Sequence, residues 1–158
     1  MKILILGHGG HGKTDFAKLL EKHHKLSFCD SSMFACERAV FPTLSKKYGY
    51  KTVEECHADR RNHRIEWRYL ISEFNTPEKS LLCSLLLAQN DVYVGMRCIN
   101  EFVASYHFFD KIYWVDALSR LGTIDHSLTI AFDPINMHRI NNNGSKDFLE
   151  HQAARVIV

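Results

Sequence analysis

The chain has 158 residues, a length that suits one domain built around one hydrophobic core. Its hydrophobic content of 46%, charged content of 24% and formal net charge of +2 are ordinary for a soluble globular protein, and the charge does not by itself indicate a nucleic-acid partner. No apolar run approaches the roughly 20 residues that cross a bilayer, so we expect no membrane partner. The five cysteines never occur as C-x-x-C, and no cleavage region of a signal peptide precedes the first glycines; both features favour a reducing cytoplasm.

Predicted strands and helices alternate along the chain. Residues 2–6 form an uninterrupted apolar run that ends at a glycine, which is typical of a buried parallel strand. Further short strands are expected at 26–29, 91–94, 111–116 and 139–141, and helices at 13–24, 32–40, 43–48, 52–57, 59–74, 76–88, 99–106 and after Gly144-Ser145. This alternation predicts an α/β fold with a five-stranded parallel sheet and helices on both faces, organised as one domain over residues 1–158.

The motif that carries chemistry follows the first strand. Gly7-His8-Gly9-Gly10-His11-Gly12-Lys13-Thr14 satisfies G-x-x-x-x-G-K-[ST], the pattern of a phosphate-binding P-loop, and it lies between an apolar strand and an amphipathic helix. All eight residues are candidate nucleotide contacts, because the glycines let backbone N–H groups close around phosphate oxygens. Lys13 is expected to reach the β- and γ-phosphates of ATP and Thr14 to supply a hydroxyl to Mg²⁺. His8 and His11 are interpreted as loop residues without a direct catalytic role, and an ordinary glycine-rich turn is the alternative interpretation of the whole motif.

A P-loop indicates nucleotide binding and leaves several activities open. The N-K-x-D motif by which GTPases read the base is absent from the sequence. A typical ATPase has an Asp at the end of the strand beside the P-loop strand, whereas the strand at 91–94 ends in Gly95-Met96-Arg97 and Asp116 ends a different strand. The small-kinase plan remains, and a nucleotide-binding protein without turnover is the alternative from another class.

A kinase of this plan needs an acid near the acceptor and arginines near the transferred phosphate. Asp30 follows the second predicted strand, at the sheet edge where ligands bind, so it can accept a proton from an acceptor hydroxyl or orient water on Mg²⁺. The alternative, which is compatible with that role, is a helix cap shared with Ser31 and Ser32; Ser31 is also a candidate acceptor contact. Arg97 can neutralise the transferring or acceptor phosphate, or it can form a structural ion pair with Glu101 one helical turn away.

Two further groups of residues are candidates for the acceptor and the lid. Arg60 and Arg64 stand at helical spacing with the apolar Trp67, so an apolar stripe becomes cationic toward the helix start and can bind an acceptor phosphate. A solvated basic face is the alternative. Residues 117–138 have no clear period and lie where such kinases carry a lid, and Arg120 is the candidate lid arginine.

Several of these segments together resemble a known family. They are the P-loop, the Asp30-Ser31-Ser32 turn, the Val92–Arg97 segment with Glu101, and the ending Ile140-Asn141-Asn142-Asn143-Gly144-Ser145 with Phe148-Leu149. These segments are similar to those of bacteriophage-type deoxynucleoside monophosphate kinases. The resemblance implies a five-stranded parallel sheet, Mg-ATP as donor, a deoxynucleotide-like acceptor, and the cytoplasm of a bacterial host as the place of action.

A second group of phage enzymes shares part of this pattern. The stretch from Phe34 through Tyr48-Gly49-Tyr50 to Trp67 resembles equally the small P-loop kinases that phosphorylate 5-hydroxymethyluracil in DNA. A short lid leaves the cleft open to a flipped base, and residues 46–68 carry seven Lys/Arg against four Asp/Glu, a balance that can contact a DNA backbone. We therefore predict a free deoxynucleoside monophosphate as acceptor, with this modified DNA as the alternative. Both predictions share in-line transfer, with Arg97 or Arg120 stabilising the transferred group.

Overall fold

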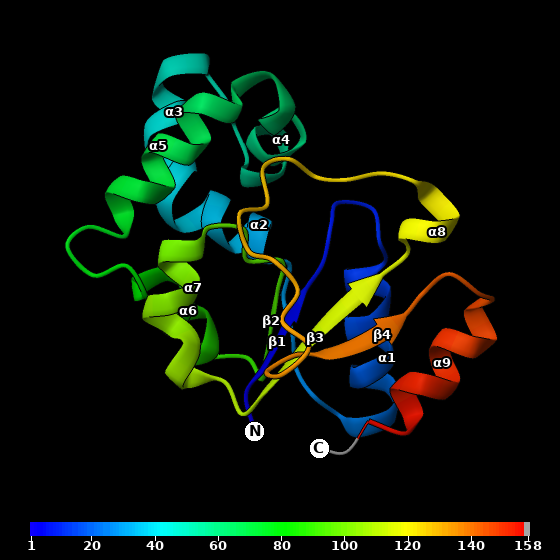
Figure 1. Ribbon diagram of the computed structural model, residues 1–158. Coiled ribbons are helices and arrows are strands. Elements are labelled where there is room, and N and C mark those ends of the chain that lie inside the picture. Colours follow the sequence, from blue (N-terminus) through cyan, green and yellow to red (C-terminus); the bar gives the residue numbers. More distant parts are fainter. Residues whose placement is uncertain (157–158) are drawn as a thin grey trace.

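The computed structural model describes residues 1–156 and consists of a parallel sheet enclosed by helices (Figure 1). Within these residues the sheet has four strands, β1 (Ile3–Leu6), β2 (Val92–Val94), β3 (Lys111–Asp116) and β4 (His138–Asn141). Their order is β2-β1-β3-β4, and every pairing is parallel. The carboxyl ends of all these strands therefore meet at one edge of the sheet, which is where ligands of such folds bind.

Helices fill the connections between the strands. In chain order they are α1 (Lys13–His24), α2 (Ser31–Ala35), the π-helical η1 (Cys36–Val40), α3 (Phe41–Tyr48), α4 (Val53–Ala58), the 3₁₀ turn η2 (Arg60–His63), α5 (Arg64–Phe74), α6 (Leu81–Leu87), α7 (Ile99–Ser105), the 3₁₀ turn η3 (Tyr106–Phe108), α8 (Leu118–Leu121) and α9 (Lys146–Ala154). The helix expected from Thr76 begins later, because Asn75 Oδ1 accepts the N–H of Leu82 at 2.9 Å and satisfies the first turn of α6. None of the described helices is long and apolar enough to cross a bilayer.

The sheet has one strand fewer than the sequence predicted. Residues 26–29 contribute a single parallel bridge between Phe28 and Val92 instead of a strand. The segment is attached only at the start of β2, where the carbonyl of Ser27 accepts the N–H groups of Asp91 and Val92. Asp30 then begins α2, so the pairing ends before a ladder can form. The α/β class, the parallel sheet and the helices on both of its faces are confirmed.

The position of Asp116 also corrects the sequence interpretation. Strand β3 pairs directly with β1, from Ile3–Lys111 to Leu6–Trp114, so Asp116 does end a strand beside the P-loop strand. Strand neighbours that are far apart in sequence could not be assigned from chain order alone. The carboxylate of Asp116 is engaged within the protein: Oδ1 accepts the N–H of Leu118 at 2.8 Å, and Oδ2 pairs with Arg139.

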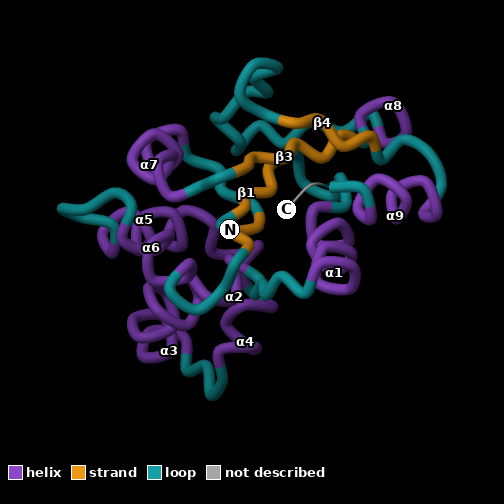
Figure 2. Tube along the Cα trace, turned by 90° about the horizontal axis from the view of Figure 1, so that it is seen from below, coloured by secondary structure: helices purple, strands orange, loops and turns teal. Residues whose placement is uncertain are grey.

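Alternate residues of β1 enter two separate cores. Ile3 and Ile5 pack with residues of α1 and α9 on one face of the sheet, while Leu4 and Leu6 pack with residues of α2 and α6 on the other. Figure 2 shows this division, with α1 and α9 together on one side of the strands and α6 and α7 on the opposite side. Burial on both faces explains why the first strand is apolar at every position.

Candidate active site

The glycine-rich loop joins β1 to α1 at the carboxyl edge of the sheet. Gly7, Gly10 and Gly12 have φ values of 137°, 78° and 93°, a region that only glycine adopts without strain. A side chain at Gly7 would also overlap the carbonyl oxygen of Val115 in β3. Glycine is therefore required both for the turn and for the close approach of the P-loop to the neighbouring strand.

Lys13 is held inside this loop. Its ammonium Nζ donates to the carbonyl oxygens of Gly7 at 2.8 Å and His8 at 2.7 Å. Burial, together with the positive charge of Arg97, lowers the pKa of Lys13 to about 8, although Asp125 acts in the opposite direction. An anionic phosphate in the loop would favour the charged ammonium and would replace the two carbonyls as its partner.

The two histidines of the loop attach it to the segment that follows β3. His11 is fully buried, and its Nδ1 accepts the N–H of Ala117 at 3.1 Å, so Nε2 carries the proton and donates to the carbonyl of Thr123 at 3.0 Å. His8 Nδ1 accepts the N–H of Asp125 at 3.1 Å, and burial followed by the charge of His11 lowers the pKa of His8. The sequence indicated no role for these rings, and the structure gives them a positioning role.

A carboxylate from the predicted lid consequently lies over the P-loop. Asp125 Oδ2 is 2.8 Å from Nη1 of Arg97, and it would stand 3.3 Å from a side-chain carbon placed on Gly9. Burial acts to raise the pKa of Asp125, but the bonds from Ser127 and the charges of Arg97 and Lys13 outweigh it and hold the pKa below its ordinary value. An anionic group thus occupies the place among the cations that a nucleotide phosphate would need. In Figure 1 this loop runs from α8 across the top of the sheet toward α4.

The carboxylate of Asp30 caps α2, as one of the sequence interpretations held. Oδ1 accepts the N–H and the hydroxyl of Ser32 at 2.9 and 2.7 Å, and the N–H of Met33 at 3.4 Å. Burial acts to raise the pKa of Asp30, but these hydrogen bonds outweigh it and the pKa lies below its ordinary value. Ser31, next to it, donates to the carbonyl of Val94, so the turn is fastened to the end of β2.

A cleft of about 880 Å³ extends from the P-loop to α5. One end is lined by Gly9, Gly10 and Arg97, and the opposite wall is cationic, with Arg60, Arg61, Arg64, Arg68 and Lys79. The apolar residues that line it include Ala35, Trp67, Ile71, Leu82 and Met96. Of the residues predicted from sequence, the structure therefore brings Ser31, Arg60, Arg64 and Arg97 together with the P-loop.

Two predicted relationships differ in the structure. Arg97 pairs with Asp125 and not with Glu101. Arg120 lies on α8 and is not among the residues that line the cleft; its Nε donates to the carbonyl of Asn142 at 3.1 Å. Asp125 carried no signal in the sequence, because it lies in a segment without periodicity and acts only across a long-range contact.

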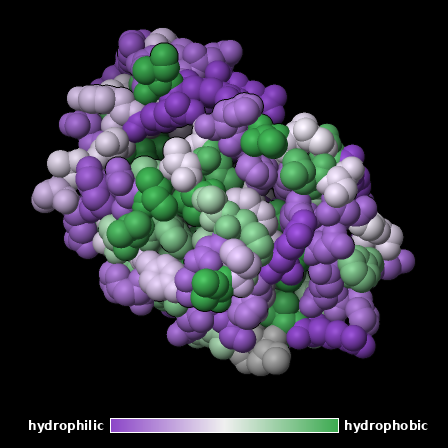
Figure 3. All heavy atoms as spheres, viewed as in Figure 1, coloured by the Kyte–Doolittle hydropathy of each residue, from purple (hydrophilic) through white to green (hydrophobic). Residues whose placement is uncertain are grey.

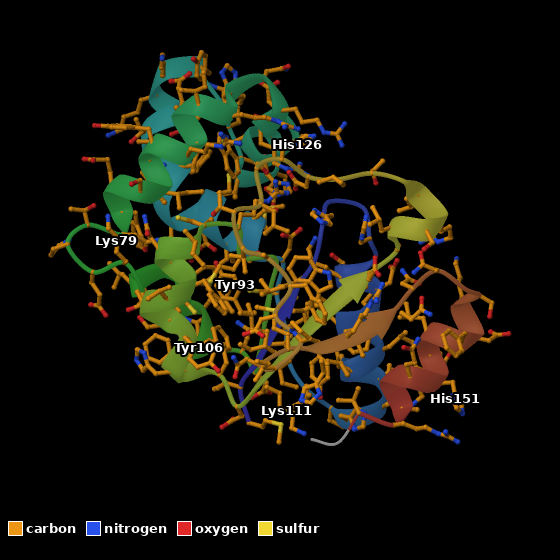
Figure 4. All side chains as sticks on the ribbon, in the orientation of Figure 1. Lys79, Tyr93, Tyr106, Lys111, His126 and His151 are labelled. Carbon is orange, nitrogen blue, oxygen red and sulfur yellow. The ribbon has the colours of Figure 1, made fainter. Side chains whose placement is uncertain are left out.

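A second unforeseen acid is Glu101, in the first turn of α7. It lines the cleft, and its Oε1 accepts the hydroxyl of Tyr93 at 3.2 Å. Burial raises the pKa of Glu101 to about 7, although the bond from Tyr93 acts in the opposite direction. Figure 4 places Tyr93 at the centre of the molecule, whereas Lys79 lies on the loop before α6. In the sequence, Glu101 was considered as a partner for Arg97 and as part of the resembling segment, and its place in the cleft depends on long-range packing.

The residues present suit Mg²⁺ bound together with a nucleotide. Such an ion takes most of its ligands from phosphates and water and only one or two from the protein. The exposed Thr14 opens α1 with a hydroxyl at the P-loop, and Asp30 Oδ2 makes no hydrogen bond within residues 1–156. No cluster of three or more His, Cys, Asp and Glu that could hold a metal occurs in that part of the chain.

The fold and the glycine-rich loop together define the class of P-loop α/β proteins. Among solved structures, a gluconokinase from Sinorhizobium meliloti 1021 is similar with a TM-score of 0.50 and 11% identity, over 97% of this chain and 89% of that one. An unliganded sugar kinase from Janibacter sp. HTCC2649 is similar with a TM-score of 0.52 and 14% identity, over 96% of this chain and 91% of that one. No family model matches the sequence, and neither does any curated protein. At these identities the likeness shows a shared fold.

Asp125→Asn is expected to bind ATP more tightly than the wild type, by about three- to tenfold. The substitution removes the negative charge beside Arg97 and Lys13, and the amide oxygen of Asn can still accept the hydrogen bond from Ser127. Calorimetry with Mg²⁺ and a non-hydrolysable ATP analogue measures the dissociation constant. Asp147→Asn, which makes the same charge change on α9, is the control and should bind like the wild type. Weaker binding by Asp125→Asn would instead make Asp125 part of the nucleotide site.

Glu101→Gln is expected to raise the melting temperature by several degrees at pH 8 and by little at pH 5. The pKa of about 7 in the folded protein lies above the ordinary value of 4.5. The folded state therefore binds this proton more tightly, and the stability that Glu101 contributes at low pH is lost as pH rises through 7. Gln stays neutral throughout. The exposed Glu73→Gln is the matched control, and a gain for Glu101→Gln that does not depend on pH would contradict the shifted pKa.

Proposed function

We propose that this protein is a P-loop kinase that transfers the γ-phosphoryl group of ATP to a deoxynucleoside monophosphate. The observation that carries the proposal is the single cleft that joins the P-loop to a wall of arginines. One end suits the phosphates of the donor, and the other suits an anionic acceptor with an apolar body. The fold shared with kinases of known structure supports phosphoryl transfer as the reaction class.

At the donor end, the binding of ATP exchanges one set of contacts for another. Lys13 turns from the carbonyls of Gly7 and His8 to the β- and γ-phosphates. Arg97 is released from Asp125 when phosphate takes the place of the carboxylate, and it then stabilises charge on the transferred group. Thr14 would hold Mg²⁺, which would supply charge neutralisation to the phosphates.

At the acceptor end, Arg60 and Arg64 bind the phosphate of the monophosphate, because a guanidinium presents paired donors to phosphate oxygens. Asp30 is not among the residues that line the cleft, but it adjoins Ser31 and Ser32, which do, and its unbonded Oδ2 can orient the acceptor. The apolar floor formed by Trp67, Ile71 and Leu82 fits a planar base. A sugar acid, the acceptor that the name gluconokinase indicates for the structural neighbour, would place its hydroxyls against this apolar floor.

The first experiment follows the label from γ-labelled ATP, with Mg²⁺ and either the four deoxynucleoside monophosphates or gluconate. Label on a monophosphate is expected, and Lys13→Ala should lower kcat/KM by at least about a hundredfold because the transition-state charge loses its ammonium. Lys18→Ala, on the exposed part of α1, should behave like the wild type. Label on gluconate alone would contradict the proposed nucleotide acceptor and make a sugar acid the acceptor. ATP binding with no transfer would favour a nucleotide-binding protein without turnover.

DNA that contains 5-hydroxymethyluracil is the second candidate acceptor. It is favoured by one observation: Arg61, Arg64 and Arg68 line the cleft and are exposed, so they can meet a phosphate backbone outside it.

Raising the salt concentration from 50 to 200 mM distinguishes the two acceptors. Phosphorylation of the modified DNA should fall steeply, because several counterions are released on binding, whereas turnover of a free monophosphate should change by only a few-fold. Labelled product is counted for both acceptors in parallel. Exclusive and salt-sensitive labelling of the DNA would make DNA the acceptor and overturn the leading proposal.

A further inference from the structure

The partly buried carboxyl group of Glu101 has more hydrogen-bonding capacity than the protein uses. Oε1 accepts the hydroxyl of Tyr93, and Oε2 makes no hydrogen bond within the described residues. The group lines the cleft, as do the apolar Met96 and Leu82. A partly buried carboxyl group in a cleft, with a raised pKa and an oxygen that makes no hydrogen bond to the protein, is a candidate ligand contact.

The surroundings of Glu101 separate it from the phosphate chemistry. The charges that shift the pKa of Lys13 are those of Arg97 and Asp125. The pKa of Glu101 is instead affected by the hydroxyl of Tyr93 on β2, and Glu101 in turn affects the pKa of Cys83 on α6. No arginine or lysine is among them. A phosphate or carboxylate of the acceptor would be repelled here, so this part of the cleft faces an uncharged part of the acceptor.

Asn75, which lines the same cleft, adds a hydrogen-bond donor to it. Its Oδ1 is occupied by the N–H of Leu82, so the amide nitrogen Nδ2 is the group that remains without a hydrogen bond among the described residues. The cleft thus combines an acceptor at Glu101, a donor at Asn75 and the apolar surface of Ile71. This combination is complementary to the edge of a planar heterocycle.

We propose that Glu101 recognises the base of the acceptor by accepting a hydrogen bond from a ring N–H group. The inference rests on the proposed monophosphate kinase activity and deepens it. A carboxylate can only accept hydrogen bonds. Guanine and thymine present a ring N–H on their pairing edge, whereas adenine and cytosine present a ring nitrogen that is itself an acceptor. Glu101 therefore favours the first pair and disfavours the second.

The test uses dGMP, dTMP, dAMP and dCMP as separate acceptors, with the label on ATP. For the wild type, kcat/KM should be about ten- to a hundredfold higher for dGMP or dTMP than for dAMP and dCMP. The amide of Glu101→Gln can donate a hydrogen bond as well as accept one. This variant should therefore have a lower kcat/KM for dGMP or dTMP and a smaller difference in kcat/KM between the two pairs of acceptors, with an unchanged KM for ATP. Glu101→Asp should restore part of the preference, and Glu73→Gln should match the wild type.

A binding measurement tests the same contact without turnover. At pH 6.5 a large share of the Glu101 carboxyl groups is protonated, because the pKa is about 7. Binding of the favoured monophosphate requires the carboxylate and should release protons. Calorimetry in two buffers of different ionisation enthalpy measures that release. Glu101→Gln should lose it, after allowance for the phosphate of the ligand, which titrates equally with both proteins.

The possible failures are distinguishable. Unchanged base preference and unchanged proton release in Glu101→Gln would overturn the role of Glu101 and leave the kinase proposal intact. A wild-type preference for dAMP or dCMP would overturn it as well. Transfer of label to none of the four monophosphates would remove the proposed acceptor, and this inference with it.

Discussion

The buried imidazole of His11 is the contact on which the arrangement of the site depends. Both ring nitrogens are bonded, one to the N–H of Ala117 and the other to the carbonyl of Thr123, so the P-loop and the segment after β3 are held together from within. Asn142 Nδ2 adds a bond of 2.8 Å to the carbonyl of His11 and joins the segment after β4 to the same point. A ring with both polar atoms satisfied in a buried position resists displacement, because any shift leaves an unpaired group. These contacts also set the position of the loop that carries Asp125.

That attachment has an electrostatic consequence. Lys13 of the P-loop and Arg97 after β2 lie at the sheet edge, and the carboxylate of Asp125 lowers the repulsion between these two cations. Under the proposed function, the phosphates of the donor would take the place of this carboxylate, so that nucleotide binding would exchange one anion for another.

The cleft divides its polarity between its two ends. Arginines on η2 and α5 form a cationic wall, while the partly buried Glu101 contacts Tyr93 of β2. On the face shown in Figure 3, hydrophobic surface lies mainly in the middle, and hydrophilic surface surrounds it. A ligand that is charged at one end and planar at the other matches this division better than one with hydroxyl groups along its whole length.

The P-loop, the strand that precedes it and the α/β class could be predicted from the sequence, because they depend on local apolar runs and on glycines in backbone conformations that other residues rarely adopt. Helical spacing and a place after a strand also indicated Arg60, Arg64 and Arg97 as cleft residues. The folded structure was needed to find that residues 26–29 form a bridge in place of a fifth strand, that β3 lies beside β1, and that Asp125 and Glu101 lie at the candidate site. The reason is physical: strand order, burial and the pairing of charges are set by contacts between residues that are distant in sequence, and no local pattern encodes them.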